Sequence, residues 1–130
     1  MSSLDHDHPV DAQAVEVTRD ALISPDDAGR LAGLLGLLAD PVRSRILFAL
    51  SGVERLCVGD IALALDISED AASYALRMLR TAGLVTFRKE GRLVFYSLAP
   101  GFPHRLLEHC LRDLLNIAAP SAPDEPPDEP

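Results

Sequence analysis

The stretch that decides the fold is Leu56–Leu98, LCVGDIALALDISEDAASYALRMLRTAGLVTFRKEGRLVFYSL. Its first part, residues 58–67, spaces apolar side chains as a short helix does. Ser68 then stands at the N-cap position of a second helix, and two acidic residues follow where they suit the helix dipole. Gly83 has the position of a glycine just past a helix C-terminus. The pattern predicts two short helices joined by a turn.

The second of these helices has two distinct faces. Its apolar positions recur at i, i+3, i+4 and i+7, which predicts one buried stripe formed by Ala72, Ala75, Leu76 and Leu79. The outer faces then carry Ser73, Tyr74, Arg77 and Arg80. A helix with this division packs on a core and leaves a polar, basic side exposed.

Two β-prone runs follow the helices. Residues 84–88 and 93–97 flank the segment Lys89-Glu90-Gly91-Arg92, which contains the glycine that a tight turn needs. We therefore expect a hairpin, and with the two helices it forms a winged helix-turn-helix. The predicted fold class is mainly α with a small β-hairpin (α+β), in a homodimeric arrangement.

Length and composition limit the class of protein. A chain of 130 residues with 48% hydrophobic content is long enough for one core plus tails. It has no run near the roughly 18 apolar residues of a membrane span, and no apolar segment of a signal peptide at its start. With two cysteines and no secretion signal, free thiols or metal ligands are expected in a cytoplasmic protein.

The distribution of charge matters more than its total. The net charge is −8, but residues 1–20 contain five acids and one arginine, and the last ten residues contain four acids. Residues 21–120 contain eleven acidic and eleven basic residues, so the body is neutral. Five basic residues gather on the second helix and the hairpin: Arg77, Arg80, Arg88, Lys89 and Arg92. Such a face can bind DNA, although without the helix-turn-helix pattern these residues would more often be an ordinary solvated surface.

The two ends differ in composition from the body. Residues 1–20 are acidic and lack helical periodicity, which predicts a flexible arm whose notable feature is the run Asp5-His6-Asp7-His8. Imidazoles and carboxylates are metal donors, but such runs near a terminus are commonly only solvated. Residues 119–130 form an acidic, proline-rich tail that is disordered by composition.

Further helices are expected on both sides of the quoted stretch, within a domain of residues 21–118. Ser24-Pro25 and Asp40-Pro41 each combine an N-cap with a proline at the first helical position. After Pro100–Pro103 a last helix places Leu107, Cys110 or Leu111, and Leu114 at helical spacing. This apolar stripe is wider than one small core needs, so we expect pairing with a second copy, as palindromic operators require.

Several motifs in order resemble the ArsR/SmtB family of metal-responsive bacterial repressors. They are DPVR at 40–43, LCVGDIA at 56–62, LRMLRTAGLV at 76–85, RKEGR at 88–92 and FYSL at 95–98. The resemblance spans about residues 26–117. It implies a homodimeric winged helix that binds operator DNA when metal-free and leaves it when a metal such as zinc or cadmium binds, controlling efflux or resistance genes.

The resemblance also implies metal-binding residues. In similar members the first helix of the helix-turn-helix and the N-terminal arm share a metal site, whose ligands match Cys57 and Asp60 here. Their i, i+3 spacing predicts one helical face, and His6 and His8 could complete a tetrahedral set. The alternative for Cys57 is a small buried hydrophobic residue. Where other members have cysteines in the arm, this chain has none.

A second family site, between the last helices of the dimer, is absent as such because Pro100 and Phe102 replace its first ligand pair. The last helix still offers His104, Glu108, His109 and Cys110 as a secondary metal candidate. Plain surface for the polar residues, and dimer packing for the cysteine, remain as alternatives.

The DNA contacts are predicted from the same resemblance and from side-chain chemistry. Ser68, Ser73 and Tyr74 are predicted DNA contacts, with Ser73 and Tyr74 at the reading positions, and the five basic residues named above would hold phosphates. Two alternatives stay open: a repressor of this fold that senses thiol oxidation, and a winged helix that binds protein. The sequence contains no phosphate loop, nucleophile elbow or His-Glu-x-x-His, so an enzyme is not expected.

Overall fold

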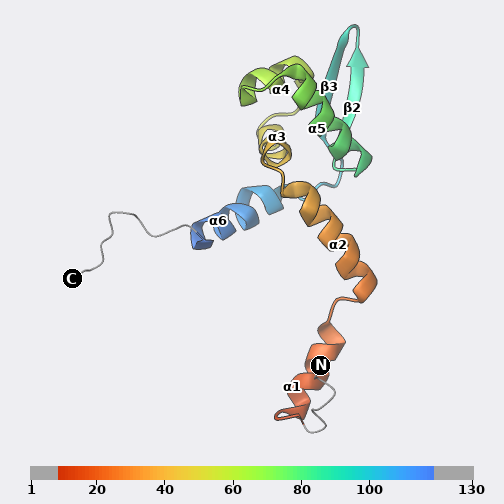
Figure 1. Cartoon of the computed structure of the whole chain (residues 1–130), viewed down its shortest axis with the longest axis vertical. Coiled ribbons are helices and arrows are strands. Elements are labelled where there is room, and N and C mark those ends of the chain that lie inside the picture. Colours follow the sequence, from red (N-terminus) through yellow and green to blue (C-terminus); the bar gives the residue numbers. More distant parts are fainter. Residues whose placement is uncertain (1–8, 119–130) are drawn as a thin grey trace, which may run out of the picture. The chain divides into compact units, whose positions relative to one another are not determined.

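The computed structural model describes residues 9–118, which divide into two units, one ending at Leu35 and one beginning at Gly36 (Figure 1). The second unit contains helices α3 (Pro41–Ser51), α4 (Val58–Leu65) and α5 (Glu69–Thr81), a small sheet, and the C-terminal helical segment. The predicted class, mainly α with a β-hairpin in a winged helix-turn-helix, is confirmed. None of the helices within residues 9–118 has the length and apolar content needed to cross a bilayer.

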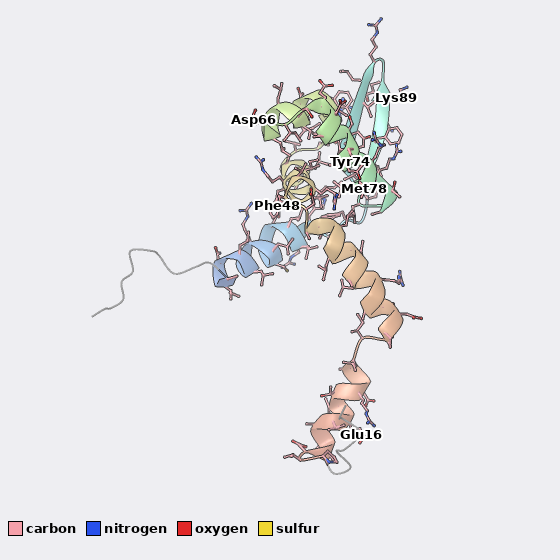
Figure 2. The ribbon with its side chains drawn as sticks, viewed as in Figure 1. Glu16, Phe48, Asp66, Tyr74, Met78 and Lys89 are labelled. Carbon is pink, nitrogen blue, oxygen red and sulfur yellow. The ribbon has the colours of Figure 1, made fainter. Side chains whose placement is uncertain are left out.

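Helices α3, α4 and α5 pack against one another around one apolar core. Helices α3 and α5 begin at side-chain caps: the Asp40 carboxylate accepts from the Arg43 N–H (3.0 Å), and Ser68 Oγ accepts from the Ala71 N–H (3.0 Å). Tyr74 and Met78 lie one turn apart on α5 (Figure 2). The predicted stripe of α5 is the one that is buried: Ala72, Ala75, Leu76 and Leu79.

Gly83 reverses the chain between α5 and the hairpin. Its φ of +81° is the left-handed conformation that glycine adopts without a side-chain clash. The Gly83 N–H donates to the Arg80 carbonyl (2.9 Å) and the Leu84 N–H donates to the Leu79 carbonyl (3.0 Å), which together form a Schellman motif. The predicted helix end is therefore confirmed.

The sheet contains one strand more than the sequence predicts. Strands β2 (Val85–Glu90) and β3 (Leu93–Leu98) form the expected hairpin around Gly91, whose φ is +62°. A two-residue strand β1 (Leu56–Cys57) pairs with β3, so the order is β1-β3-β2 and all pairs are antiparallel. Lys89 and Glu90, predicted in the turn, belong to β2.

The N-terminal unit corrects one expectation. Residues 1–20 were expected to be a flexible arm without helical periodicity, but Ala12–Ala21 form helix α1, so the boundary at residues 20 and 21 falls inside a helix. Asp11 is its N-cap, because the carboxylate accepts from the Ala14 N–H at 3.0 Å. None of the residues of α1 is buried. Residues 1–8, with His6 and His8, and the tail 119–130 lie outside the described residues.

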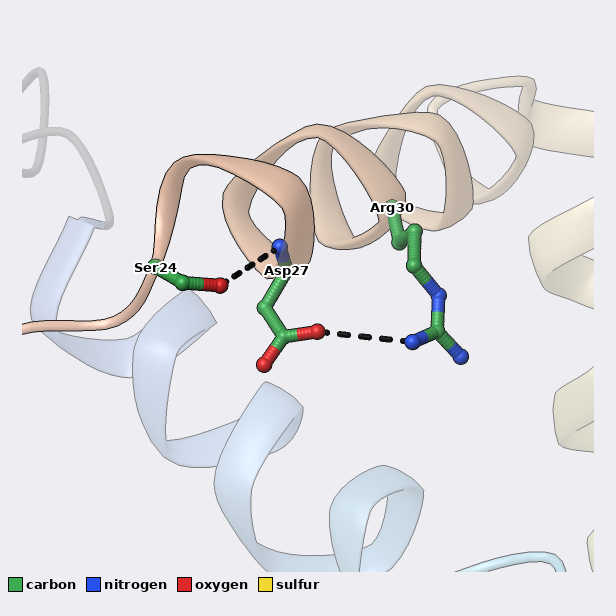
Figure 3. Close-up of polar contacts among 3 residues, drawn as sticks. All are labelled: Ser24, Asp27 and Arg30. Carbon is green, nitrogen blue, oxygen red and sulfur yellow. Dashed lines mark hydrogen bonds and ion pairs between the residues drawn. The ribbon is translucent and has the colours of Figure 1, made fainter.

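Helix α2 (Pro25–Leu38) begins where the sequence predicts. Ser24 Oγ accepts from the Asp27 N–H at 3.1 Å, and the Asp27 carboxylate lies 3.4 Å from the Arg30 guanidinium (Figure 3). The first contact caps the helix, and the second is an exposed ion pair within its first turns. Apolar side chains of α2 remain exposed, namely Leu31, Leu34 and Leu35.

The C-terminal segment is helical but not a regular α-helix throughout. A π-helical turn η2 (Leu106–Leu111) precedes α6 (Arg112–Ala118). Leu107, 1% exposed, anchors this segment on the core, where η2 contacts α3. The side chains of Leu114 and Ile117 are 57% and 82% exposed. An apolar surface is thus left uncovered on α6.

Candidate nucleic-acid interface and metal centre

The outer side of α5 presents the side chains that were predicted to read DNA. Tyr74 is 57% exposed, Arg77 is exposed, and Ser73 is half-buried. The Arg77 guanidinium lies 5.9 Å from the centroid of the Tyr74 ring, three residues earlier on the same helix. Ser68 is exposed, but its Oγ already accepts the hydrogen bond that caps α5. Its main role is therefore to stabilise the start of the helix that would bind DNA.

The remaining predicted basic residues extend this surface onto the hairpin. Arg88 and Lys89 lie on β2 and Arg92 lies in the turn, and all three are exposed. Because α5 contacts β2, the five exposed basic side chains, here called the basic face, lie on neighbouring elements. Figure 2 shows Tyr74 on α5 and Lys89 on the hairpin. The structure thus brings the five predicted cationic residues onto two adjacent elements.

An aromatic pair beneath this face was not predicted. Phe87 of β2 is 45% exposed, and the Arg80 guanidinium carbon lies 4.7 Å from its ring centroid. On its other flank, Phe87 contacts the buried Tyr96 of β3, with ring centroids 5.9 Å apart. The alternation of residues in the strand puts Phe87 on the same side as buried Val85, which is the signal that could have identified it.

Arg55 was also missed, because its partners are distant in sequence. Its guanidinium binds the Glu90 carboxylate at 2.6 Å and lies 3.9 Å from the centroid of the Phe95 ring. This hydrogen bond raises the pKa of Arg55 and lowers the pKa of Glu90. The contact joins the segment before β1 to the far end of the hairpin and lines a groove with Arg88, Phe95 and Ser97.

The primary metal candidate has a different local geometry from the one expected. Cys57 is not on a helical face: it ends β1, opposite Phe95, and is the N-cap residue of α4, with extended backbone angles. Asp60 is the third residue of α4 and is exposed. N-cap and N3 side chains approach each other in capping boxes, so a thiolate and a carboxylate at these positions can still reach one ion.

The described residues contain no group of three metal-donor side chains close enough to hold an ion. Cys57 and Asp60 therefore supply at most two ligands from residues 9–118, and His6 and His8 lie outside that range. A half-buried thiol beside an exposed carboxylate suits a borderline metal such as Zn²⁺ in its chemistry. Cys57 and Asp60 therefore fit a metal site whose other ligands come from outside the described residues of one chain.

The secondary metal candidate is dispersed along the C-terminal segment. His104, Glu108, His109 and Cys110 are all exposed, and the π-helical turn replaces the α-helical spacing that was assumed for them. The ring of His104 packs edge-on against Phe102, with centroids 6.1 Å apart. The absence of a three-residue cluster within residues 9–118 applies to this set as well.

Comparison with known proteins links these features to one group. Residues 40–86 match the family model described as "Bacterial regulatory protein, arsR family". The chain is 44% identical over 90 residues to the transcriptional repressor SmtB homolog of Synechocystis sp., covering 69% of this chain and 67% of that protein. It is 38% identical over 89 residues to the cadmium resistance transcriptional regulatory protein CadC homolog of Staphylococcus aureus, covering 68% and 74%. The solved structure of HlyU from Vibrio cholerae superposes with a TM-score of 0.62 at 33% identity, covering 70% and 97%.

Proposed function

Because the chain belongs to the ArsR family of bacterial regulatory proteins, a family of transcriptional regulators and not of enzymes, we propose that it is a metal-responsive repressor. In this proposal it binds operator DNA as a homodimer in the cytoplasm and releases the DNA when a divalent ion, zinc or cadmium, binds. The observation that carries the proposal is the basic face shared by α5 and the hairpin, next to a segment that holds a free thiol and a carboxylate.

The charge distribution supports DNA as the partner. The chain as a whole has a net charge of −8, yet Arg77, Arg80, Arg88, Lys89 and Arg92 are all exposed on adjacent elements. Exposed guanidinium and ammonium groups bind phosphates and release counterions, so affinity would fall steeply with salt. Tyr74, at the exposed centre of α5, can donate or accept one hydrogen bond but cannot read a base with two, so the operator differs from those read by an amide or imidazole pair.

Metal binding would act on the same unit of structure. Cys57 and Asp60 stand at the junction of β1 and α4, and His6 and His8 of the arm would complete the site, within one chain or across the dimer. The relative in Staphylococcus aureus is named for cadmium resistance, which supports a metal as the effector. A coupling free energy of about 1–3 kcal/mol between metal and DNA suffices for release by a factor of about 5–150.

Two exposed apolar surfaces support the homodimer. Leu31, Leu34 and Leu35 on α2, and Leu114 and Ile117 on α6, face solvent in a single chain. Burial of such surfaces against a second copy is favourable, and a two-fold axis would relate two α5 helices for palindromic half-sites.

Metal-dependent release is tested with an operator selected from random duplexes by the metal-free protein. Zinc, cadmium or cobalt should weaken binding of the wild type by tens of fold, and Cys57→Ser should remove this response while preserving metal-free binding. Cys110→Ser is the matched control and should respond as the wild type does. A thiolate band in the cobalt absorption spectrum should disappear only in Cys57→Ser. Unchanged operator affinity with all three metals would contradict the proposal.

A thiol-oxidation sensor is the second candidate, and one observation favours it. Both cysteines within residues 9–118 are free, and Cys110 is exposed to solvent. An oxidation sensor would lose its response after alkylation and would ignore chelators, whereas a metal sensor would recover full DNA binding when a chelator removes the ion. Salt-dependent operator binding by residues 21–120 alone would argue against a winged helix that binds a protein partner in place of DNA.

A further inference from the structure

Arg80, Phe87 and Tyr96 form a stack that leads from the protein surface to its core. The Arg80 guanidinium, in the last turn of α5, lies 4.7 Å from the centroid of the Phe87 ring. The Phe87 ring meets the ring of Tyr96 at 5.9 Å with an interplanar angle of 31°, and Tyr96 is 6% exposed. The Arg80 guanidinium is therefore held by the Phe87 ring, and contact with buried Tyr96 fixes that ring in place.

The exposure of Phe87 is otherwise unexplained. It is an aromatic ring with 45% of its surface exposed, between Thr86 and Arg88 on a strand that is largely polar. The carboxylate of Glu90 on the hairpin forms an ion pair with Arg55. Within residues 9–118, no acidic side chain forms an ion pair with Arg80. The face of a guanidinium that lies on a ring leaves the N–H groups at its edge available to an anion.

We infer that Phe87 is a positioning residue, which holds Arg80 for an operator phosphate at the junction of α5 and the hairpin. The inference rests on DNA binding in the proposed function. Arg80 reaches from the helix to the ring of Phe87 on the hairpin, so its guanidinium lies where the two DNA-binding elements meet. Arg77 differs, because its aromatic neighbour Tyr74 lies on the same helix, and at the longer distance of 5.9 Å. It therefore serves as the matched control.

The test is a double-mutant cycle on operator affinity, measured by fluorescence anisotropy with full-length protein and the selected operator. Phe87→Leu removes the ring but keeps apolar bulk, and should weaken binding roughly two- to fivefold. Phe87→Tyr keeps the ring and should bind as the wild type does. Arg80→Ala should lower the slope of log affinity against log salt by about 0.9 for each protomer, since one phosphate contact is lost.

The cycle separates positioning from general damage to the hairpin. In the Arg80→Ala background, Phe87→Leu should not weaken operator binding any further. In the Arg77→Ala background, it should weaken operator binding by the full two- to fivefold. Phe87→Met repeats the measurement with a second non-aromatic side chain, and thermal unfolding monitors the fold of every variant. Equal losses of operator affinity in both arginine backgrounds would overturn this inference but leave the proposed function standing. Failure of the wild type to bind any duplex would overturn the proposed function, and this inference with it.

Discussion

Replacement of Leu114 by alanine should separate assembly of the repressor from folding of the chain. Leu114 lies on α6 with 57% of its side chain exposed in the single chain, so it contributes little to the core. Complete burial of a leucine side chain contributes roughly 1.5–3 kcal/mol. Burial of the exposed part against a partner would then contribute about 1 kcal/mol per protomer, and about 2 kcal/mol across a symmetric dimer.

The expected result is a dimer dissociation constant raised by a factor of about 30, because each 1.4 kcal/mol is a tenfold change. Sedimentation equilibrium over a range of protein concentrations measures this constant directly. The circular dichroism spectrum of Leu114→Ala should remain that of the wild type, since no buried contact is removed.

Leu107→Ala is the matched control on the same segment. Leu107 is 1% exposed and anchors η2 on the core, so its truncation should lower the free energy of unfolding by about 3–5 kcal/mol. Urea unfolding of the two variants at equal concentration compares the effects. A wild type that stays monomeric at tens of micromolar, or a Leu114→Ala dimer as tight as the wild type, would refute the assignment of α6 to the interface.

Three further predictions concern folding. Ser68→Ala should cost about 1 kcal/mol of unfolding free energy in urea, since the Ala71 N–H loses its acceptor; a loss below experimental error would show that water replaces the cap. Gly83→Ala should cost about 1–2 kcal/mol because φ is +81°, and a neutral result would mean that the turn changes conformation. Arg55 lowers the pKa of Glu90, so the ion pair stabilises the hairpin above the ordinary pKa of 4.5 and is lost as pH falls through the lower folded value. Urea unfolding of wild type and Glu90→Gln should therefore differ at pH 7, and the difference should shrink as pH falls below 4.5; a difference that does not shrink in acid would exclude this origin.

The elements that the sequence predicted correctly are those whose signals are local. Ser68 caps α5 through a bond to a residue three positions later, and Gly83 ends the same helix with bonds that reach back three and five residues. The buried stripe of α5 repeats every three or four residues. Helix α1 was missed although Asp11 caps it, because its only large apolar residues are Val15 and Val17 and none of its residues is buried.

The sequence by itself determined the order of the helices from α2 onward, the hairpin and the residues of the basic face, since caps, turn glycines and apolar spacing act within one or two turns of chain. Only the tertiary structure decided the position of the Cys57 thiol. Strand β1 has two residues and exists because Leu56 and Cys57 pair with Tyr96 and Phe95, which moves Cys57 from the expected helix to its N-cap. The same holds for Arg55 with Glu90, 35 residues apart, and for Arg80 over Phe87. Such partners meet only after the chain has folded, because no periodicity in either segment specifies the other.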